Sequence, residues 1–152
     1  MLPDSLRDNP IAAALEDLAV AGKSEFGEIT VEVAAANVLD ALRRLKDLKF
    51  EQLTTVTGVD RYPAEPRFEV VYHLHSFAKK LRVRVKARLS GGAPEIESAC
   101  GIYRGANWYE REIFDFYGVV FLNHPDLRRI MLPDDWEGYP LRKDVAVTGT
   151  RY

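Results

Sequence analysis

The fold is decided by residues 68–89, which read FEVVYHLHSFAKKLRVRVKARL. Apolar residues recur at every second position in both 68–75 and 81–89. This is the period of a β-strand that buries one of its faces. Only the short link 76–80 separates the two runs. The spacing therefore predicts two antiparallel strands joined as a hairpin, and the other elements can be placed around it.

A helix, a strand and a second helix are predicted ahead of the hairpin. Asn9 and Pro10 fit an N-cap and a first helical position, and Gly22 fits the stop of that helix. Residues 28–33 alternate as a half-buried strand. Asn37 fits the cap of the second helix. The inward-facing residues would be Ile11, Leu15 and Leu18 in the first helix, and Val38, Leu42 and Leu45 in the second.

Three more elements follow from local patterns. Residues 53–59 are rich in threonine and valine and predict a strand, and 95–99 is a weaker strand candidate. Residues 107–117 predict a helix that ends at Gly118. The predicted class is α+β, with two helices packed on one face of a mixed, largely antiparallel sheet. A further helix and an extended C-terminal segment follow that sandwich.

The composition is that of a folded domain without a global charge bias. Of the 152 residues, 47% are hydrophobic and 29% are charged, enough to bury a core without staples. The formal net charge of −2 favours neither nucleic acid nor an anionic membrane surface. No apolar run approaches the ~20 residues of a membrane span, and the first residues do not resemble a secretory signal. We expect a soluble protein, cytoplasmic if bacterial, that reaches a membrane only through a partner.

Few side chains suggest chemistry of their own. Cys100 is the only cysteine, so it forms no internal disulfide, and a cluster or structural zinc site needs about four ligands. His73 and His75 share a strand face, but nothing nearby in the sequence supplies a third ligand, which favours exposed histidines. The sequence has no Gly-rich phosphate loop and no Gly-x-Ser-x-Gly motif. We predict no catalytic, cofactor-binding or metal-binding residue.

The strand 81–89 places a row of cations on one side of the sheet. One interpretation is a site for RNA phosphates. The row lacks the interleaved aromatic residues that stack bases, and Glu69 on the neighbouring strand can pair across the sheet. A solvated face, or one that docks on an acidic partner, is favoured. The cations are Arg82, Arg84, Lys86 and Arg88.

The helix 107–117 has two different faces. Its apolar stripe, which can pack on the sheet, consists of Tyr109, Ile113, Phe116 and Tyr117. The other side carries Trp108, Arg111, Glu112 and Asp115, of which Arg111 and Asp115 are four apart and can pair. Carboxylates could serve acid–base chemistry, but a tryptophan among outward charges is typical of a protein interface. A surface helix with a partly covered tryptophan is the alternative.

The run 119–144 is stiffened by prolines at 125, 133 and 140 and has no lasting periodicity. Trp136 and Tyr139 can anchor in a partner, and the arginines offer forked donors for carboxylates. An ordered irregular segment of this length usually lies on another surface. We therefore predict two parts, an α+β domain at 1–118 and an extended subunit-binding segment at 119–152.

Two runs within this region resemble a known family. Residues 110–130, ERExFDFYGVxFxxHPxLRRI, and residues 132–144, LPDDWEGxPLRKD, look like the signature of the C subunit (30-kDa family) of proton-translocating NADH:quinone oxidoreductase, respiratory complex I. Two departures lie near the end of the chain. Tyr139 stands where the family often has histidine, and Val145-Ala146 stands where an aromatic residue and proline are frequent.

The resemblance implies a non-redox structural subunit of the peripheral arm, which supports electron transfer from NADH to quinone coupled to proton translocation. It implies no cofactor on this chain, with NADH, FMN, iron–sulfur clusters and quinone on other subunits. The expected partner is the D subunit, which helps form the quinone site, with the B and I subunits nearby. The expected place is the cytoplasmic side of the inner membrane, if bacterial. An equivalent subunit of a ferredoxin-dependent complex or of a membrane-bound hydrogenase is the alternative.

Together, the interface features and the resemblance predict the residues that contact the partner. They are Trp108, Arg111, Glu112, Asp115, His124, Arg128, Arg129, Trp136, Arg142 and Lys143.

Overall fold

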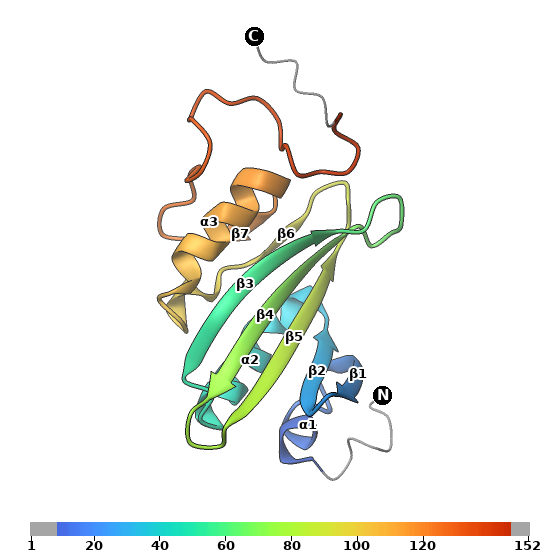
Figure 1. Ribbon diagram of the computed structural model, residues 1–152, viewed down its shortest axis with the longest axis vertical. Helices are drawn as coiled ribbons and strands as arrows, with labels where there is room; N and C mark the ends of the chain where they lie inside the picture. Colours follow the sequence, from blue (N-terminus) through green and yellow to red (C-terminus); the bar gives the residue numbers. More distant parts are fainter. Residues whose placement is uncertain (1–8, 147–152) are drawn as a thin grey trace.

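The computed structural model describes residues 9–146, and its centre is a five-stranded sheet in the order β1-β2-β5-β4-β3 (Figure 1). β2 and β5 are parallel, and the other neighbouring strands are antiparallel. The hairpin predicted from residues 68–89 is confirmed as β4 and β5, with Phe68 opposite Leu89. The strands are β1 (Ala19–Glu25), β2 (Glu28–Val33), β3 (Gln52–Asp60), β4 (Phe68–Ser76) and β5 (Leu81–Leu89).

Helices cover the apolar face of this sheet, which confirms the predicted α+β class. α1 (Pro10–Ala14), the 3-10 turn η2 (Ala35–Asn37) and α2 (Val38–Asp47) pack on this face, and α2 lies behind the sheet in Figure 1. Alternate residues of β4 and β5 meet the helices in one core, because strand side chains point to opposite faces in turn. The predicted inward residues of α2 are fully buried. Asn37 precedes α2, but its side chain makes no capping hydrogen bond.

The first helix is shorter than the sequence predicts. α1 ends at Ala14, and Gly22 is not a helix stop but lies in β1 opposite Val31 of β2. Ile11 and Leu15 are buried as predicted. A helix with so few core positions has little stability of its own, whereas pairing with β2 supplies backbone partners to the residues that follow. The strand pairing therefore overrides the helical spacing.

The third helix, α3 (Ala106–Tyr117), packs on the same face beside β3 (Figure 1). Gly58 of β3 permits this contact, because a Cβ there would lie 2.9 Å from Cδ2 of Tyr117. α3 ends at Gly118, whose φ of 73° is left-handed. In the chain, β6 (Glu95–Glu97) and the 3-10 turn η3 (Ala99–Gly101) precede α3, and β7 (Val120–Leu122) follows it.

β6 and β7 pair in parallel as a second, small sheet. Phe121 of β7 is 2% exposed and belongs to the same core as the large sheet. After β7 the chain runs to residue 146 without a further helix or strand, arching over the C-terminal end of α3 (Figure 1). We call residues 123–146 the strap. None of the described helices is long and apolar enough to cross a membrane.

Candidate functional site

The strap is attached to its own domain by a buried aspartate of α3. Asp115 is fully buried. Its Oδ2 accepts hydrogen bonds from the backbone N–H groups of residues 130, 131 and 132 at 3.1, 2.7 and 2.9 Å. Its Oδ1 accepts one from Nη1 of Arg129 at 2.8 Å. Burial alone would raise the pKa of this carboxyl, but the hydrogen bonds outweigh burial and hold the pKa below its ordinary value.

Two arginines complete this anchor. Nη2 of Arg129 donates to the backbone oxygens of Trp136 and Gly138 at 3.0 and 2.9 Å. Arg111 donates to the backbone oxygens of residues 128 and 129, both at 3.1 Å. The prediction that Arg111 pairs with Asp115 is therefore wrong, and so is the outward position of Asp115. The strap covers this part of α3, so donors from the strap reach Asp115 instead.

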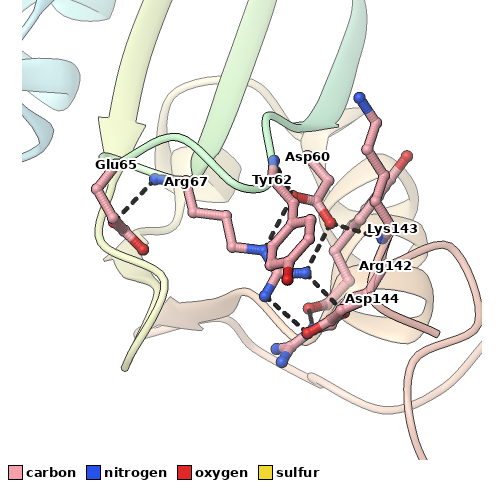
Figure 2. Close-up of polar contacts among 8 residues, drawn as sticks. Asp60, Tyr62, Glu65, Arg67, Arg142, Lys143 and Asp144 are labelled. Atoms are coloured by element: carbon pink, nitrogen blue, oxygen red, sulfur yellow. Dashed lines mark hydrogen bonds and ion pairs between the residues drawn. The ribbon is translucent and has the colours of Figure 1, made fainter.

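The far end of the strap is held by three residues that we call the clasp: Asp60, Arg67 and Asp144 (Figure 2). Arg67 donates from Nε and Nη2 to Asp60 at 2.9 and 2.8 Å. It donates from Nη1 and Nη2 to Asp144 at 2.9 and 2.7 Å. The backbone N–H of Lys143 also donates to Asp60, at 2.8 Å. The guanidinium of Arg67 is the main cause that holds the pKa of Asp60 far below its usual range.

Arg142 adds a contact between the two anchors. Its Nε donates to the backbone oxygen of Tyr117 at 2.7 Å. Its guanidinium lies over the rings of Tyr139 and Phe68, 4.7 and 5.1 Å from their centroids. This packing needs a glycine at position 118, where a Cβ would lie 2.5 Å from the Tyr139 ring. The strap is thus extended, yet hydrogen bonds to its own domain hold it in place.

The predicted partner-binding residues fall into two groups. The polar groups of Arg111, Asp115, Arg129 and Arg142 contact the chain itself, and Trp136 is half-buried. Four residues remain exposed: Trp108, Glu112, Arg128 and Lys143. Contact with a partner stays a prediction for both groups. Sequence reasoning did not single out Met131 and Leu141, which are 64% and 50% exposed on the strap.

His124, also predicted to bind a partner, starts the strap from inside the domain. Its side chain is fully buried. Nδ1 accepts a hydrogen bond from the backbone N–H of Asp126 at 3.0 Å. The proton of the neutral ring therefore belongs on Nε2, which lies 3.2 Å from the backbone oxygen of Asn107.

Glu110 lies beside His124 and is also fully buried. It accepts hydrogen bonds from Ser98 Oγ at 2.6 Å and from the backbone N–H of Ala99 at 2.7 Å. Burial raises its pKa despite these bonds. Sequence reasoning assigned Glu110 to neither face of the helix. The helical spacing from Ala106 through Glu110 to Ile113 is the signal that could have placed it on the inner face.

The cationic row of β5 lies on the other face of the sheet, and glutamates neutralise much of it. Lys86 and Arg61 bond the two carboxylate oxygens of Glu69 at 2.8 and 2.9 Å, and Glu69 also lies opposite Arg88 in the register. The predicted cross-strand role of Glu69 is confirmed. Glu28 pairs with Arg84 at 3.3 Å and Glu32 with Arg88 at 3.0 Å. A face neutralised in this way offers a weak field to RNA phosphates.

A family model described as the 30-kDa subunit of respiratory-chain NADH dehydrogenase matches residues 31–151. The C subunit of the NADH-quinone oxidoreductase of Roseiflexus castenholzii is 47% identical over 149 residues, which cover 92% of this chain and 85% of that protein. The C subunit of the Geotalea uraniireducens enzyme is 47% identical over 124 residues, covering 81% and 76%.

Two solved structures are similar in sequence and in fold. The trypsin-resistant fragment of Nqo5 is 28% identical with a TM-score of 0.63, covering 68% of this chain and 86% of that chain. A chain of the membrane-bound sulfane sulfur reductase, an archaeal respiratory membrane complex, is 30% identical with a TM-score of 0.78. That match covers 90% of this chain and 84% of the archaeal one.

Proposed function

The chain belongs to the family of the 30-kDa subunit of respiratory-chain NADH dehydrogenase, and from this membership we propose a structural, non-redox role in the peripheral arm of an NADH:quinone oxidoreductase. Its relatives are subunits of that enzyme complex. In this proposal the chain binds none of the redox cofactors, so that NADH, FMN, iron–sulfur clusters and quinone are bound by other subunits. It meets the cytoplasmic side of a bacterial inner membrane only through the complex.

The proposed partner is the D subunit, which binds the strap and the outward side of α3, with the B and I subunits nearby. One observation carries this proposal: the strap is extended, yet its own domain anchors it near both ends. A segment ordered in advance loses little conformational entropy when it docks. Around it Trp108, Met131 and Leu141 expose the large apolar side chains that anchor protein interfaces. Within the predicted segment 119–152 we assign docking to the strap alone. β7, which also lies in that segment, pairs with β6 and is therefore part of the folded domain.

Co-expression with a tagged D subunit tests this assignment. Met131→Glu and Leu141→Glu each place a charge in the proposed interface, and we expect at least about tenfold less capture than for the wild type. Phe26→Glu is the matched control, because Phe26 is fully exposed in the turn between β1 and β2, remote from the strap (Figure 1). The isolated variants should melt at the wild-type temperature. If both strap variants are captured as well as the control, the strap is not the docking surface.

The likeness to the archaeal reductase favours a second candidate, an equivalent subunit of a related respiratory membrane complex. That chain aligns over more of this protein, and with a higher TM-score, than the Nqo5 fragment does. The two candidates differ in the electron donor and not in the role of this chain. The complex should therefore be isolated through a tag on this chain and assayed for NADH oxidation. NADH-input subunits and NADH oxidation support the first candidate, and their absence from an intact complex supports the second.

A further inference from the structure

A cluster of metal-ligating side chains lies where η3, α3 and the start of the strap meet. Within the described part of the chain, Cys100, Glu110 and His124 bring one ligand atom each to within 4.8 Å of the others. Cys100 Sγ is 3.4 Å and His124 Nε2 is 3.8 Å from the same carboxylate oxygen of Glu110. The three residues come from η3, from α3 and from the start of the strap. Three separately packed segments therefore fix the cluster.

A second observation at this place is the hydroxyl of Tyr72. Tyr72 is fully buried in β4, and its hydroxyl is the buried side-chain polar atom of the described residues that has no hydrogen-bond partner. Burial first, and then the charges of Glu110 and Cys100, raise the pKa of this hydroxyl. The hydroxyl is therefore within electrostatic range of two residues of the cluster. A buried polar group without a hydrogen-bond partner is costly, and a bound water or ion can supply the missing partner.

The cluster has a path to solvent. Cys100 is half-exposed and lines an open cavity of about 600 Å³ together with Lys46, Gly101, Tyr103 and Arg104. Glu110 and His124 have no exposed side-chain surface, so Cys100 is the ligand of the three that lines this cavity. An ion can thus arrive at the thiol first and then meet the two buried ligands.

We propose that Cys100, Glu110 and His124 form a binding site for one zinc-class divalent cation. Thiolate, carboxylate and imidazole together are a donor set that Zn²⁺ accepts, and three protein ligands leave a fourth position for water. A tetrahedral ion with bonds of about 2.0–2.3 Å holds its ligand atoms roughly 3.3–3.7 Å apart. The two distances to Glu110, 3.4 and 3.8 Å, are in or near this range, and binding would draw His124 toward Cys100 from a separation of at most 4.8 Å. The bound water would give the Tyr72 hydroxyl its missing partner.

Binding has a cost that sets the expected affinity. The Cys100 thiol must release its proton to solvent. His124 must exchange its contact with the Asn107 oxygen for the metal, and its remaining ring proton then faces the Asp126 N–H. We therefore expect a dissociation constant of about 1 µM, much weaker than that of a structural zinc finger. The proposal does not depend on any other protein of the complex.

The test is metal titration of the isolated full-length chain, freed of metal and kept reduced. Competition with a chromophoric chelator should show one equivalent of Zn²⁺ bound, and Co²⁺ should give a thiolate-to-cobalt charge-transfer band. Cys100→Ala should abolish that band and weaken Zn²⁺ binding at least about 100-fold, since even outer-shell changes cost 10–100-fold. Tyr72→Phe keeps the ring and should weaken binding about tenfold.

The matched control is His75→Ala, which removes a half-exposed histidine of β4 whose ring meets the Phe77 ring edge-to-face. It should leave the affinity and the cobalt spectrum unchanged. Circular dichroism establishes that the Cys100 and Tyr72 variants remain folded. The proposal is overturned if no stoichiometric binding occurs below about 100 µM, or if binding survives Cys100→Ala. It is equally overturned if His75→Ala removes the binding, because the ion then sits on surface histidines.

Discussion

Asp115 uses both of its carboxylate oxygens to hold the strap, so its effect can be isolated by one substitution. Asp115→Asn keeps the shape but turns one acceptor into a donor, which then faces N–H groups. We expect the free energy of unfolding to fall by about 2–4 kcal/mol, because buried donors lose a charged partner. Urea denaturation at pH 7 measures this loss. Glu112→Gln, an exposed change on the same helix, should stay within about 0.5 kcal/mol of the wild type. Equal stability of the two variants would contradict the anchoring role.

The carboxyl of Asp60 links stability to pH. Its pKa is held far below the ordinary value, mainly by the hydrogen bonds from Arg67. The folded protein therefore binds this proton less readily than the unfolded chain does. The resulting stabilisation is complete above the unfolded pKa of about 4 and is lost as the pH falls through the lower folded value. We expect urea midpoints to fall below about pH 4. The fall should be smaller in Asp60→Asn, which is less stable at pH 7, and an identical fall in both proteins would exclude Asp60 as its source.

Among the elements, those with a long regular pattern could be predicted from the sequence. The alternation in 68–89 predicted β4 and β5, and the spacing of Val38, Leu42 and Leu45 predicted α2, because each pattern matches the period of the element it forms. β1 could not be found in this way. It is an edge strand whose side chains are half-exposed or exposed, so backbone pairing with β2 holds it and little apolar periodicity marks it. β7 has only three residues and left no pattern to read.

The strap was predicted to be extended, but its attachment to its own domain was not. Asp60 and Asp144 lie at opposite ends of the clasp and are far apart in the chain, so no local spacing relates them. The burial of Asp115 likewise depends on what folds over it. Sequence patterns report the period of one element, whereas these contacts depend on how separate elements meet. For this reason the sequence could show that the arginines of the strap belong to a polar, extended segment, but it could not predict which groups they would bind.

At the scale of the whole molecule, the clasp holds the proposed docking surface in place. We therefore predict that a clasp residue can affect docking by ordering the strap, even without contacting the partner. Asp144→Ala removes one side of the clasp and leaves the Arg67–Asp60 pair intact. We expect residues 142–146 to lose most of their protection from amide hydrogen exchange, with the protection of β4 and β5 unchanged. Once this end of the strap is mostly disordered, affinity for the D subunit should fall severalfold, because only the fraction with an ordered strap binds tightly.

The matched control is Asp134→Ala, which removes the same charge from an exposed position of the same strap. It should change neither the exchange rates nor the affinity. Combining Asp144→Ala with Leu141→Glu should cost less affinity than the sum of the two single effects, since both act on one end of the strap. Faster exchange without any loss of affinity would mean that this end of the strap does not dock. Additive losses would mean that Asp144 and Leu141 act at independent surfaces, which would contradict a strap that docks as one ordered unit.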